Sequence, residues 1–328
     1  MASSTMTLQL RTTVALTVLV LAVFGAPAAS AQYPSRPITL TVSTTAGASP
    51  DLIARLFAKQ LSDAFKVPVV VENRGGANGR IATQAIANAS PDGYSLLATT
   101  GATLTINPAL YPTAKLVTAQ LAPVTQLAHQ DFVLATRPSL NVRTLSDLIT
   151  WSTKNPGKLN VATTALGSLA YLTAQLFKQA ADVEFVTITH NGGEQAVTTV
   201  LGNNADVLVE SISLSRPYIE SGKLVPLAVT GPKRSAYLPD VPTLIESNVN
   251  VQTSGWTAIV APKDTPTGIL RRIQQELRKG LENAAIRNKL DDMCAEPIVN
   301  SPADFERDWE QEEQMWSGVI RKAGIELN

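Results

Sequence analysis

The sequence predicts an α/β fold with two domains. The chain has 328 residues, which is more than one ordinary core requires and fits two domains of common size. Short segments rich in β-branched residues alternate with segments whose apolar residues recur at helical spacing. Strands that alternate with helices form parallel sheets covered by helices on both faces. We therefore expect two α/β lobes, each built on a mostly parallel sheet.

The N-terminal segment has the pattern of a secretory signal peptide. Arg11 is the only charged residue in residues 1–31, and an apolar run at residues 14–24 follows it. Residues 29–31 (ASA) form a small-x-small cleavage site, so cleavage is expected before Gln32. An N-terminal membrane anchor is the alternative, although the apolar run is short for a membrane span. The pattern favours export.

Composition is typical of a soluble globular protein and argues against nucleic-acid binding. Hydrophobic residues make up 45% and charged residues 16% of the sequence. The 27 basic and 27 acidic residues cancel, so no basic excess can neutralise phosphates. Cys294 is the only cysteine, which excludes an internal disulfide and is typical of a small buried residue. Two histidines and this one cysteine offer no metal cluster of recognised spacing, and no cofactor is expected.

Strands and helices are predicted along the rest of the chain. Strands are expected at residues 38–43, 67–72, 94–99, 159–162, 183–189, 205–209, 224–229 and 256–261. Helices are expected from residue 49 and at residues 81–88, 145–152, 168–181, 194–201, 266–282 and 302–323. Ser49 is predicted to cap its helix, with Pro50 at the first helical position. The strand at residues 67–72 is nearly continuously apolar, so we expect it to be buried on both faces.

Two loops of nearly the same composition occupy equivalent places in this order. The first loop, residues 44–49 (TTAGAS), follows a strand and opens a helix, and the second loop, residues 163–168 (TTALGS), does the same. Helix N-termini leave backbone N–H groups unpaired and carry partial positive charge. Glycine lets a ligand approach the backbone, and hydroxyl groups add donors without charge. Ligands of open parallel sheets bind beyond the carboxyl ends of the strands, where both loops would lie.

The pair of loops therefore predicts an anion site. Two helix N-termini that face each other across a cleft could hold both ends of a dicarboxylate. The alternative is that both loops are ordinary capped turns, which are common. Catalysis is not predicted, because the chain has no nucleophile elbow and no Walker loop, and the turn at residues 75–79 lacks the dinucleotide spacing. A carboxylate-based hydrolase remains an unfavoured alternative.

Several short motifs in fixed order resemble one known family. They stand at residues 33–38 (YPSRPI), 51–55 (DLIAR), 70–77 (VVENRGGA), 91–94 (PDGY), 107–111 (NPALY), 222–224 (GKL), 238–243 (LPDVPT) and 261–266 (APKDTP). Together they are similar to the Bug-type extracytoplasmic receptors of tripartite tricarboxylate transporters. The resemblance extends over residues 33–325, nearly the whole chain after the predicted signal peptide.

The resemblance implies a periplasmic binding protein of the two-lobed Venus-flytrap kind, type II, with a hinge of two crossings. The first lobe is then expected at residues 32–133 and 256–328, the second at residues 134–255, and the crossings near residues 130–137 and 252–258. It implies a monomer that captures a small carboxylate without catalysis and delivers it to a membrane permease. Signalling to a membrane sensor is an alternative that the sequence leaves open.

Carried over to this chain, the resemblance places the ligand at the two loops and near Thr100, Thr103 and Glu210. The full set of predicted ligand-binding residues is Thr44, Thr45, Ala46, Gly47, Ser49, Asp51, Thr100, Thr103, Thr163, Thr164, Leu166, Gly167, Ser168, His190 and Glu210. Asp51 also suits a structural role as a first-turn acid, and this role is favoured. His190 is either a pH-sensitive ligand contact or a packing residue. Glu210 either accepts a hydrogen bond from the ligand or pairs with Arg216.

The chain departs from the family pattern mainly in the second lobe's half of the cleft. Tyr171 and Gln175 stand where the family usually has His and Glu, and Glu210 stands where an Asp is usual. Residues 189–190 (TH) replace a common Pro-Tyr pair, and Ala48 replaces a second glycine in the first loop. These departures leave the expected fold unchanged, but they leave the identity of the carboxylate open.

Overall fold

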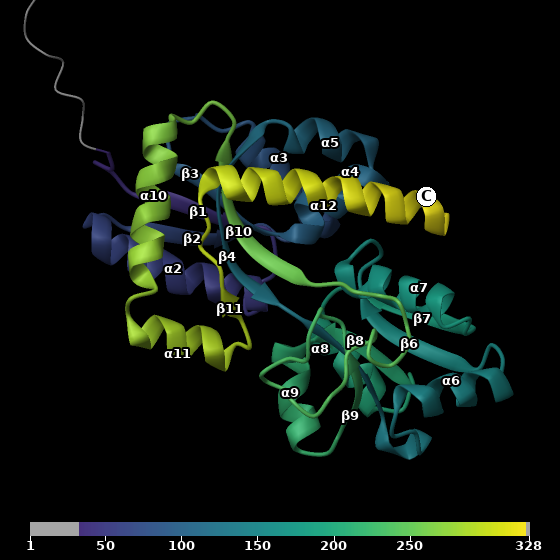
Figure 1. Cartoon of the computed structure of the whole chain (residues 1–328). Coiled ribbons are helices and arrows are strands. Elements are labelled where there is room, and N and C mark those ends of the chain that lie inside the picture. Colours follow the sequence, from purple (N-terminus) through teal and green to yellow (C-terminus); the bar gives the residue numbers. More distant parts are fainter. Residues whose placement is uncertain (1–32, 326–328) are drawn as a thin grey trace, which may run out of the picture. The chain divides into compact units, whose positions relative to one another are not determined.

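Residues 33–325 are described by a computed structural model of the chain (Figure 1). The chain separates into two units, Met1–Arg36 and Pro37–Asn328, and the fold described below lies in the second unit. The predicted signal peptide, residues 1–31, lies outside the described residues. No helix within residues 33–325 combines the length and the apolar composition that a membrane span requires.

Six strands form the sheet of the first lobe, in the order β11-β4-β10-β3-β1-β2. They are β1 Ile38–Val42, β2 Val69–Asn73, β3 Ser95–Thr100, β4 Leu121–Gln130, β10 Gly255–Pro262 and β11 Glu296–Pro297. Its helices are α2 Ser49–Phe65, α3 Arg80–Ala87, α4 Asn107–Leu110, α5 Pro112–Thr118, α10 Thr267–Gly280, α11 Ala284–Asp292 and α12 Pro302–Ala323, with a 3-10 turn at Ala77–Gly79 and a π-helix at Ala102–Ile106. β1 pairs in parallel with β2 and β3, whereas β10 runs antiparallel to β3 and β4.

Five strands form the sheet of the second lobe, in the order β7-β6-β8-β5-β9. They are β5 Phe132–Thr136, β6 Leu159–Thr164, β7 Phe185–His190, β8 Val207–Ser211 and β9 Val225–Val229. Its helices are α6 Leu145–Lys154, α7 Leu169–Ala180, α8 Gly193–Leu201 and α9 Ile212–Glu220, with a 3-10 turn at Pro138–Leu140. β6 is parallel to β7 and β8, and β5 is antiparallel to β8 and β9. The two-lobed α/β prediction is confirmed, with sheets that are mixed because the strands next to the crossings run antiparallel.

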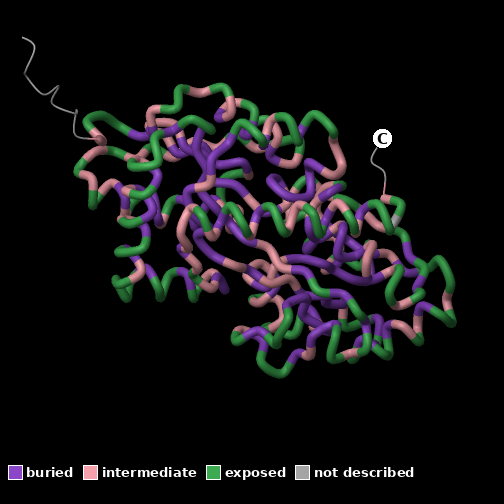
Figure 2. Tube along the Cα trace, turned by 45° about the horizontal axis from the view of Figure 1, so that its top comes forward, coloured by how far each residue is buried: buried purple, intermediate pink, exposed green. Residues whose placement is uncertain are grey.

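Each lobe has its own buried core, visible as the inner purple segments in Figure 2. In the second lobe Phe177 of α7 stacks on Phe185 of β7, with ring centroids 6.3 Å apart. In the first lobe Phe305 of α12 lies between Trp256 and Trp309, with centroid distances of 5.5 Å and 5.8 Å. Aromatic pairs in such geometries add to the stabilisation that comes from buried apolar area. The apolar residues that recur at regular spacing in the sequence therefore pack into two separate cores.

The chain changes sheets at Asp131 and again just before β10. β4 ends at Gln130 and β5 begins at Phe132, so the predicted lobe boundary after residue 133 falls inside β5. Asp131 joins the two crossings, because its Oδ1 accepts a hydrogen bond from Ser254 Oγ at 2.6 Å. His129 Nε2 lies 3.2 Å from the same oxygen. This bond with Asp131 raises the pKa of the His129 imidazole, although burial acts in the opposite direction.

Two expectations about the first lobe are wrong. The strand at residues 67–72 was expected to be buried on both faces, but β2 is the edge strand of its sheet and Val70 is 53% exposed. Ser49 does not cap α2: the N-cap is Ala48, which supplies no side-chain bond, and Ser49 is the first helical residue. Its hydroxyl instead accepts a hydrogen bond from Gln130 Nε2 at 2.6 Å. Gln130, which lies at the end of β4 and far from Ser49 in the sequence, therefore bonds the hydroxyl group that was expected to cap α2.

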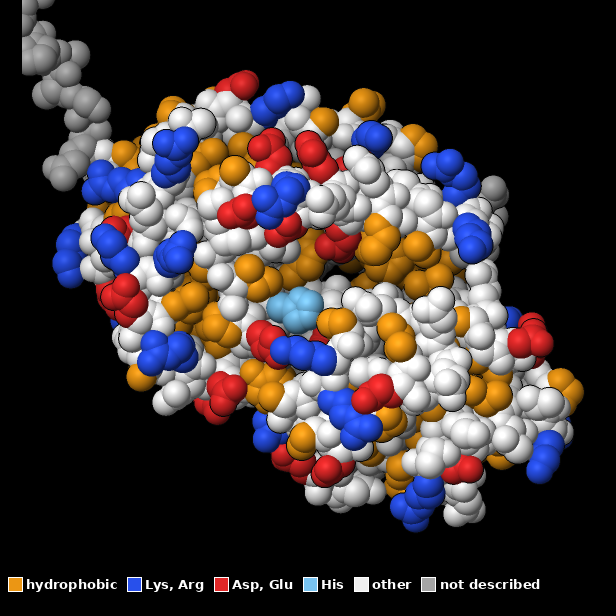
Figure 3. Space-filling model, in the orientation of Figure 1, with side chains coloured by type: hydrophobic (Ala, Val, Ile, Leu, Met, Phe, Trp, Pro, Cys, Tyr) orange, Lys and Arg blue, Asp and Glu red, His pale blue; other side chains and the backbone are white. Residues whose placement is uncertain are grey.

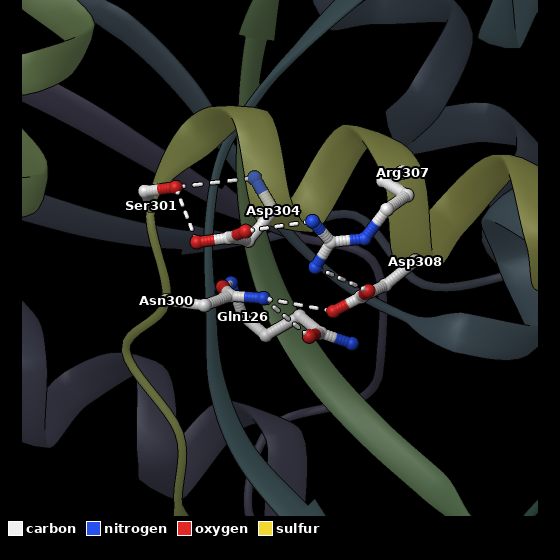
Figure 4. Close-up of polar contacts among 6 residues, drawn as sticks. All are labelled: Gln126, Asn300, Ser301, Asp304, Arg307 and Asp308. Atoms are coloured by element: carbon white, nitrogen blue, oxygen red, sulfur yellow. Dashed lines mark hydrogen bonds and ion pairs between the residues drawn. The ribbon is translucent and has the colours of Figure 1, made fainter.

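The start of α12 is fixed to β4 by side chains that Figure 4 shows in close contact. Ser301 caps the helix and accepts from the Asp304 backbone N–H at 3.1 Å, and its hydroxyl donates to Asp304 Oδ2 at 2.7 Å. Asn300 Nδ2 donates to Gln126 Oε1 at 2.8 Å, which connects this cap to a buried strand residue. Arg307 Nη1 pairs with Asp304 at 2.9 Å. The predicted helix at residues 302–323 is confirmed, and its position on the sheet is set by these polar contacts.

The far half of α12 packs on the second lobe. Trp316 and Ile320 of α12 form one apolar cluster with Leu169 and Leu172 of α7. All four side chains are buried, at 2%, 5%, 7% and 0% exposure respectively. Hydrophobic side chains gather along the seam between α12 and α7 in Figure 3. The C-terminal helix of one lobe therefore contacts the first helix turn beyond the second loop.

Candidate functional site

The first loop is a tight turn between β1 and α2. The Ala48 N–H donates to the Thr45 carbonyl at 3.3 Å, and Gly47 adopts φ +83°. This φ lies in the left-handed region, which glycine adopts without steric cost. Thr45, Ala46 and Gly47 are exposed, and the buried Thr44 Oγ1 has no hydrogen-bond partner in the described part of the chain. α2 has no capping side chain, Pro50 has no N–H, and the Asp51 N–H donates to the Ala48 carbonyl at 2.9 Å. Of the first three helical residues, Ser49 is therefore the one whose N–H has no acceptor in the described part of the chain.

Asp51 holds the first loop by hydrogen bonds to the loop backbone and to neighbouring side chains. Its Oδ2 accepts from the Gly47 N–H at 2.9 Å and from Arg55 Nε at 3.0 Å, and its Oδ1 accepts from Asn73 Nδ2 at 2.8 Å. The side chain is 1% exposed. Burial alone would raise the pKa of Asp51, but the hydrogen bonds from Arg55, Gly47 and Asn73 outweigh it and hold the pKa below its usual value. These contacts support the structural role that the sequence favoured.

The second loop repeats the turn with a different cap. The Ser168 N–H donates to the Ala165 carbonyl at 2.9 Å, and Gly167 adopts φ +75°. The Ser168 hydroxyl caps α7 by accepting from the Tyr171 N–H at 3.1 Å, and Thr164 Oγ1 donates to Ser168 Oγ at 2.8 Å. By position in the turn, Gly47 corresponds to Gly167 and Ala48 corresponds to Ser168. The two loops therefore share a backbone fold but not the chemistry of the cap.

The glycine-rich turn after β2 connects the first lobe to the second loop. Asn78, at φ +57°, donates from Nδ2 to the Leu166 carbonyl at 3.3 Å. Its own carbonyl accepts from Asn107 Nδ2 at 2.9 Å and from Thr103 Oγ1 at 3.2 Å. Asparagine tolerates the left-handed conformation better than most residues. Asn78 is thus held by the first lobe and touches the second loop at an exposed leucine.

Predicted residues Thr100 and Thr103 support this turn. Their hydroxyls lie 3.1 Å apart, and Thr103 is buried inside the π-helix Ala102–Ile106. A Cβ atom on Gly79 would stand 2.6 Å from Thr103 Oγ1, so only glycine fits against this hydroxyl. Thr103 therefore positions the turn that carries Asn78, and Thr100, at half burial, bonds to it from the end of β3.

His190 and Thr163 are engaged with each other inside the second lobe. Nδ1 of His190 lies 3.2 Å from the Thr163 carbonyl, and Nε2 lies 2.8 Å from Thr199 Oγ1. A carbonyl oxygen only accepts, so Nδ1 carries a proton. Thr163 is 0% exposed and its hydroxyl donates to the Thr164 carbonyl at 3.0 Å. Both ring nitrogens of His190 are thereby used within the lobe, as the packing interpretation requires.

Glu210 is buried at the end of β8 and does not pair with Arg216. Arg216 Nε bonds Glu220 Oε1 at 2.7 Å, one helical turn further along α9. Glu210 Oε1 accepts from the Ser211 N–H at 2.8 Å, while Oε2 has no partner among residues 33–325. Burial raises the pKa of the Glu210 carboxyl to about 7. The proposed pairing with Arg216 is wrong, because α9 turns that side chain toward the next helical turn.

Sequence reasoning missed three residues that organise the site. Asn78 and Asn107 stand in motifs noted only for their glycines or for family resemblance, and Gln130 lies in a strand that was not predicted. The one usable signal was Asn78 in a glycine-rich turn, since Asn is the residue that most often joins glycine at positive φ. No group of three or more His, Cys, Asp or Glu able to hold a metal occurs in the part of the chain that the structure describes.

The chain is similar to known proteins of one receptor family. The profile of the family described as "Tripartite tricarboxylate transporter family receptor" matches residues 53–325. Protein BugT of Bordetella pertussis (strain Tohama I) is 33% identical over 306 residues, which cover 92% of this chain and 94% of BugT.

Two solved structures with bound carboxylates are similar to this fold. The structure of Rpa4515 from R. palustris with adipate has a TM-score of 0.84 and 32% identity, and covers 90% of this chain and 99% of that chain. MatC (Rpa3494) from Rhodopseudomonas palustris with bound malate has a TM-score of 0.79 and 25% identity, and covers 88% of this chain and all (100%) of that chain. Adipate and malate are both small dicarboxylates.

Proposed function

The chain belongs to the tripartite tricarboxylate transporter receptor family, and from that premise we propose that it captures a small mono- or dicarboxylate between the first and second loops. The family consists of solute-binding receptors, so the chain is a receptor and not an enzyme. Two relatives hold dicarboxylates, and this supports the same ligand class for a chain that shares 32% and 25% identity with them.

One observation carries the proposal: both loops present a left-handed glycine directly before a helix N-terminus, and Asn78 touches the second loop from the first lobe. Helix N-termini favour anions by their dipole and their free N–H groups. The loops contain Thr, Ala, Leu, Gly and Ser and no acidic residue. Asp51, the acid that follows the first loop in the sequence, has its oxygens occupied and pairs with Arg55. A carboxylate at the first loop would therefore meet donors while Arg55 offsets the charge of Asp51.

The buried Thr44 hydroxyl adds to this argument. Thr44 Oγ1 has no partner in the described residues. An unsatisfied buried hydroxyl costs about 1–3 kcal/mol, which a ligand oxygen or a water molecule would recover. Thr44 stands immediately before the turn that carries Gly47. A ligand carboxylate at this turn is well placed to use the hydroxyl.

We extend the proposal to location and partner. The N-terminal pattern of residues 1–31 favours export, and BugD, another member of the fold group, is a periplasmic binding protein. A receptor of this family would deliver its ligand to the membrane permease of the transporter. The fold and the family support delivery to such a permease.

A thermal-shift panel of carboxylates tests the proposed function. The protein without residues 1–31 is heated with adipate, malate, succinate, a tricarboxylate and an aromatic acid. A specific ligand at about one hundred times its Kd stabilises the folded state by about 2.7 kcal/mol. A matched series of neutral amides of the same acids is the control, since these keep the carbon skeleton and lose the charge. Stabilisation by the amides alone, or by none of the acids, contradicts the proposal.

A further inference from the structure

Glu210 is a buried carboxyl group with one hydrogen-bonded oxygen, Oε1, which accepts from the Ser211 N–H at 2.8 Å. It is 6% exposed, and Oε2 makes no hydrogen bond within the described residues. Most buried polar atoms in folded proteins have a partner, so an orphan of this kind calls for a specific explanation. An unpaired ionised carboxylate is far more costly to bury than a neutral carboxyl. A buried carboxylate without a partner therefore tends to take up a proton.

The surrounding backbone is shaped to admit this carboxyl. A Cβ atom on Gly193, the first residue of α8, would stand 2.7 Å from Glu210 Oε2 and 2.5 Å from Leu214 Cδ2. Gly193 has no side chain, and the carboxyl occupies the space that one would fill. Glu210 is therefore part of the packing between α8, α9 and the end of β8.

Glu210 also stands beside the second loop. β6 and β8 run parallel, with Val161 opposite Val207 and Ala162 opposite Leu208. Continued for two residues, this register brings Glu210 next to Thr164, where the second loop starts. Neighbouring strands are about 5 Å apart. An anion held at the second loop would thus lie close to the end of the strand that carries the buried carboxyl.

The charged groups of the neighbouring elements leave Glu210 without a counter-ion. Glu194 in the first turn of α8 acts on it as a like charge, and burial is the larger cause that raises its pKa to about 7. Arg216 on α9 is engaged with Glu220. His190 on β7 bonds the Thr163 carbonyl and Thr199.

The crossing beside β5 adds no counter-ion either. Asp131, which precedes that strand, is held by Ser254 and His129. No described cation is therefore placed to keep Glu210 ionised.

We propose that Glu210 takes up one proton from solvent when an anion binds at the second loop, so that this chain binds its carboxylate together with a proton. The inference rests on the proposed function, because it needs an anion at that loop. No covalent bond changes: a proton adds to Oε2 and is released again when the ligand leaves. Glu210 is a positioning residue in this scheme and does not touch the ligand.

The physical reason is the repulsion between like charges in a weakly polar environment. A bound anion disfavours the ionised form of a nearby carboxyl, and this effect is strong where water is excluded. Linkage makes the effect reciprocal: if the anion favours protonated Glu210, then protonated Glu210 favours the anion. The ligand class that follows is a fully ionised carboxylate whose affinity increases as the pH falls through the range in which Glu210 titrates.

Binding as a function of pH tests the inference, with adipate and malate as probes. Both probes carry ionised carboxylates between pH 6 and pH 8, since carboxyl groups in water titrate near pH 4. For the wild-type protein the Kd of a probe is expected to increase about tenfold from pH 6 to pH 8. Calorimetry at pH 8 in two buffers of different ionisation enthalpy should show uptake of close to one proton per ligand.

Two variants separate Glu210 from other titrating groups. Glu210→Gln keeps the shape of the protonated side chain, so it should bind the probe at pH 8 about as tightly as the wild type does at pH 6, with no proton uptake. Glu184→Gln makes the same chemical change at an exposed residue of this lobe, ahead of β7, and should retain the wild-type pH dependence. A pH dependence that persists in Glu210→Gln would assign the proton to another group and overturn the inference.

The outcomes also distinguish this inference from the proposed function. If a probe binds the wild type with the same Kd at pH 6 and pH 8 and without proton uptake, the proton linkage is wrong while the receptor function stands. If no carboxylate of the panel binds at any pH, the proposed function itself fails. Unfolding by urea at each pH verifies that Glu210→Gln is folded, and its stability should no longer decrease between pH 4.5 and pH 7 as the wild type's does.

Discussion

The first and second loops have the same backbone turn, but different side chains stabilise it. In the second loop the Ser168 side chain caps α7, and Thr164 bonds that cap. In the first loop the cap position is Ala48, and Asp51 from inside the helix holds the turn together with Asn73 and Arg55. Both helices nevertheless keep N–H groups without an acceptor in the described residues: those of Leu169 and Ala170 in α7, and that of Ser49 in α2, where Pro50 has no N–H and Asp51 donates to the Ala48 carbonyl. We expect both helix N-termini to contribute to anion binding.

The largest expected effect is the removal of the Asp51 carboxylate. Asp51→Ala strips three hydrogen bonds from a side chain that is 1% exposed, and we expect a loss of about 3 kcal/mol in the free energy of unfolding. Asp63→Ala on the same helix removes only an exposed pair with Lys59 and should cost less than about 1 kcal/mol. Urea unfolding measures both. Equal losses in the two variants would mean that Asp51 does not hold the first loop.

Bulk at the second glycine tests whether that loop closes on the ligand. Gly167→Val places a β-branched residue at φ +75°, which costs about 1–2 kcal/mol in backbone conformation alone. We expect stability to decrease by that amount and the Kd of a bound carboxylate to increase at least tenfold. Gly157→Val, at φ +72° with no heavy atom within 4 Å of its Cβ, carries the same backbone strain on the second lobe away from the loop. Unchanged affinity in Gly167→Val would exclude the second loop from the site.

Exchanging the residues at the two N-cap positions tests the comparison of the two loops directly. Ser168→Ala removes the cap of α7 and should lower the free energy of unfolding by about 1 kcal/mol with little effect on affinity. Ala48→Ser introduces a hydroxyl at an N-cap with suitable angles, φ −66° and ψ 152°, and should stabilise α2 by up to about 1 kcal/mol. Because that hydroxyl would accept from the Asp51 N–H and leave the Ser49 N–H free, we expect little change in carboxylate binding. A large change of affinity in either variant would show that the cap position itself takes part in binding.

The smallest expected effect is at the crossing next to the first loop. Gln130, which bonds Ser49, lies between His129 and Asp131. Because the pKa of His129 is raised in the folded state, its pairing with Asp131 stabilises the fold fully below the unfolded pKa, and this contribution disappears as the pH increases through the folded pKa. The pair is partly exposed, so less than about 1 kcal/mol is expected. Asp131→Asn should flatten the decline in stability above pH 6.5, and an unaltered decline would contradict the pairing.

Most secondary-structure elements were predictable because their signals are local. The predicted helix at residues 302–323 matches α12 (Pro302–Ala323), and α7 begins after Ser168 as its loop suggested. β4 and β5 were not predicted, since Leu121–Gln130 mixes polar residues with apolar ones and contains a proline. Thr125 and Gln126 of β4 are buried polar residues that Asn300 satisfies from the other end of the chain. A local sequence pattern does not predict a strand whose polar groups are hydrogen-bonded to residues far away in the sequence.

The sequence by itself determined where the two loops stand and that glycine must occupy each turn. These are properties of short segments: a strand ends, a residue with positive φ follows, and a helix begins. Only the tertiary structure decided which groups hold the loops. It placed Asn78 against Leu166, gave the Ser49 hydroxyl to Gln130, and turned Arg216 away from Glu210. Hydrogen bonds and burial depend on atoms brought together by folding, so the charge of a carboxyl such as Glu210 is set by neighbours that the linear sequence does not identify.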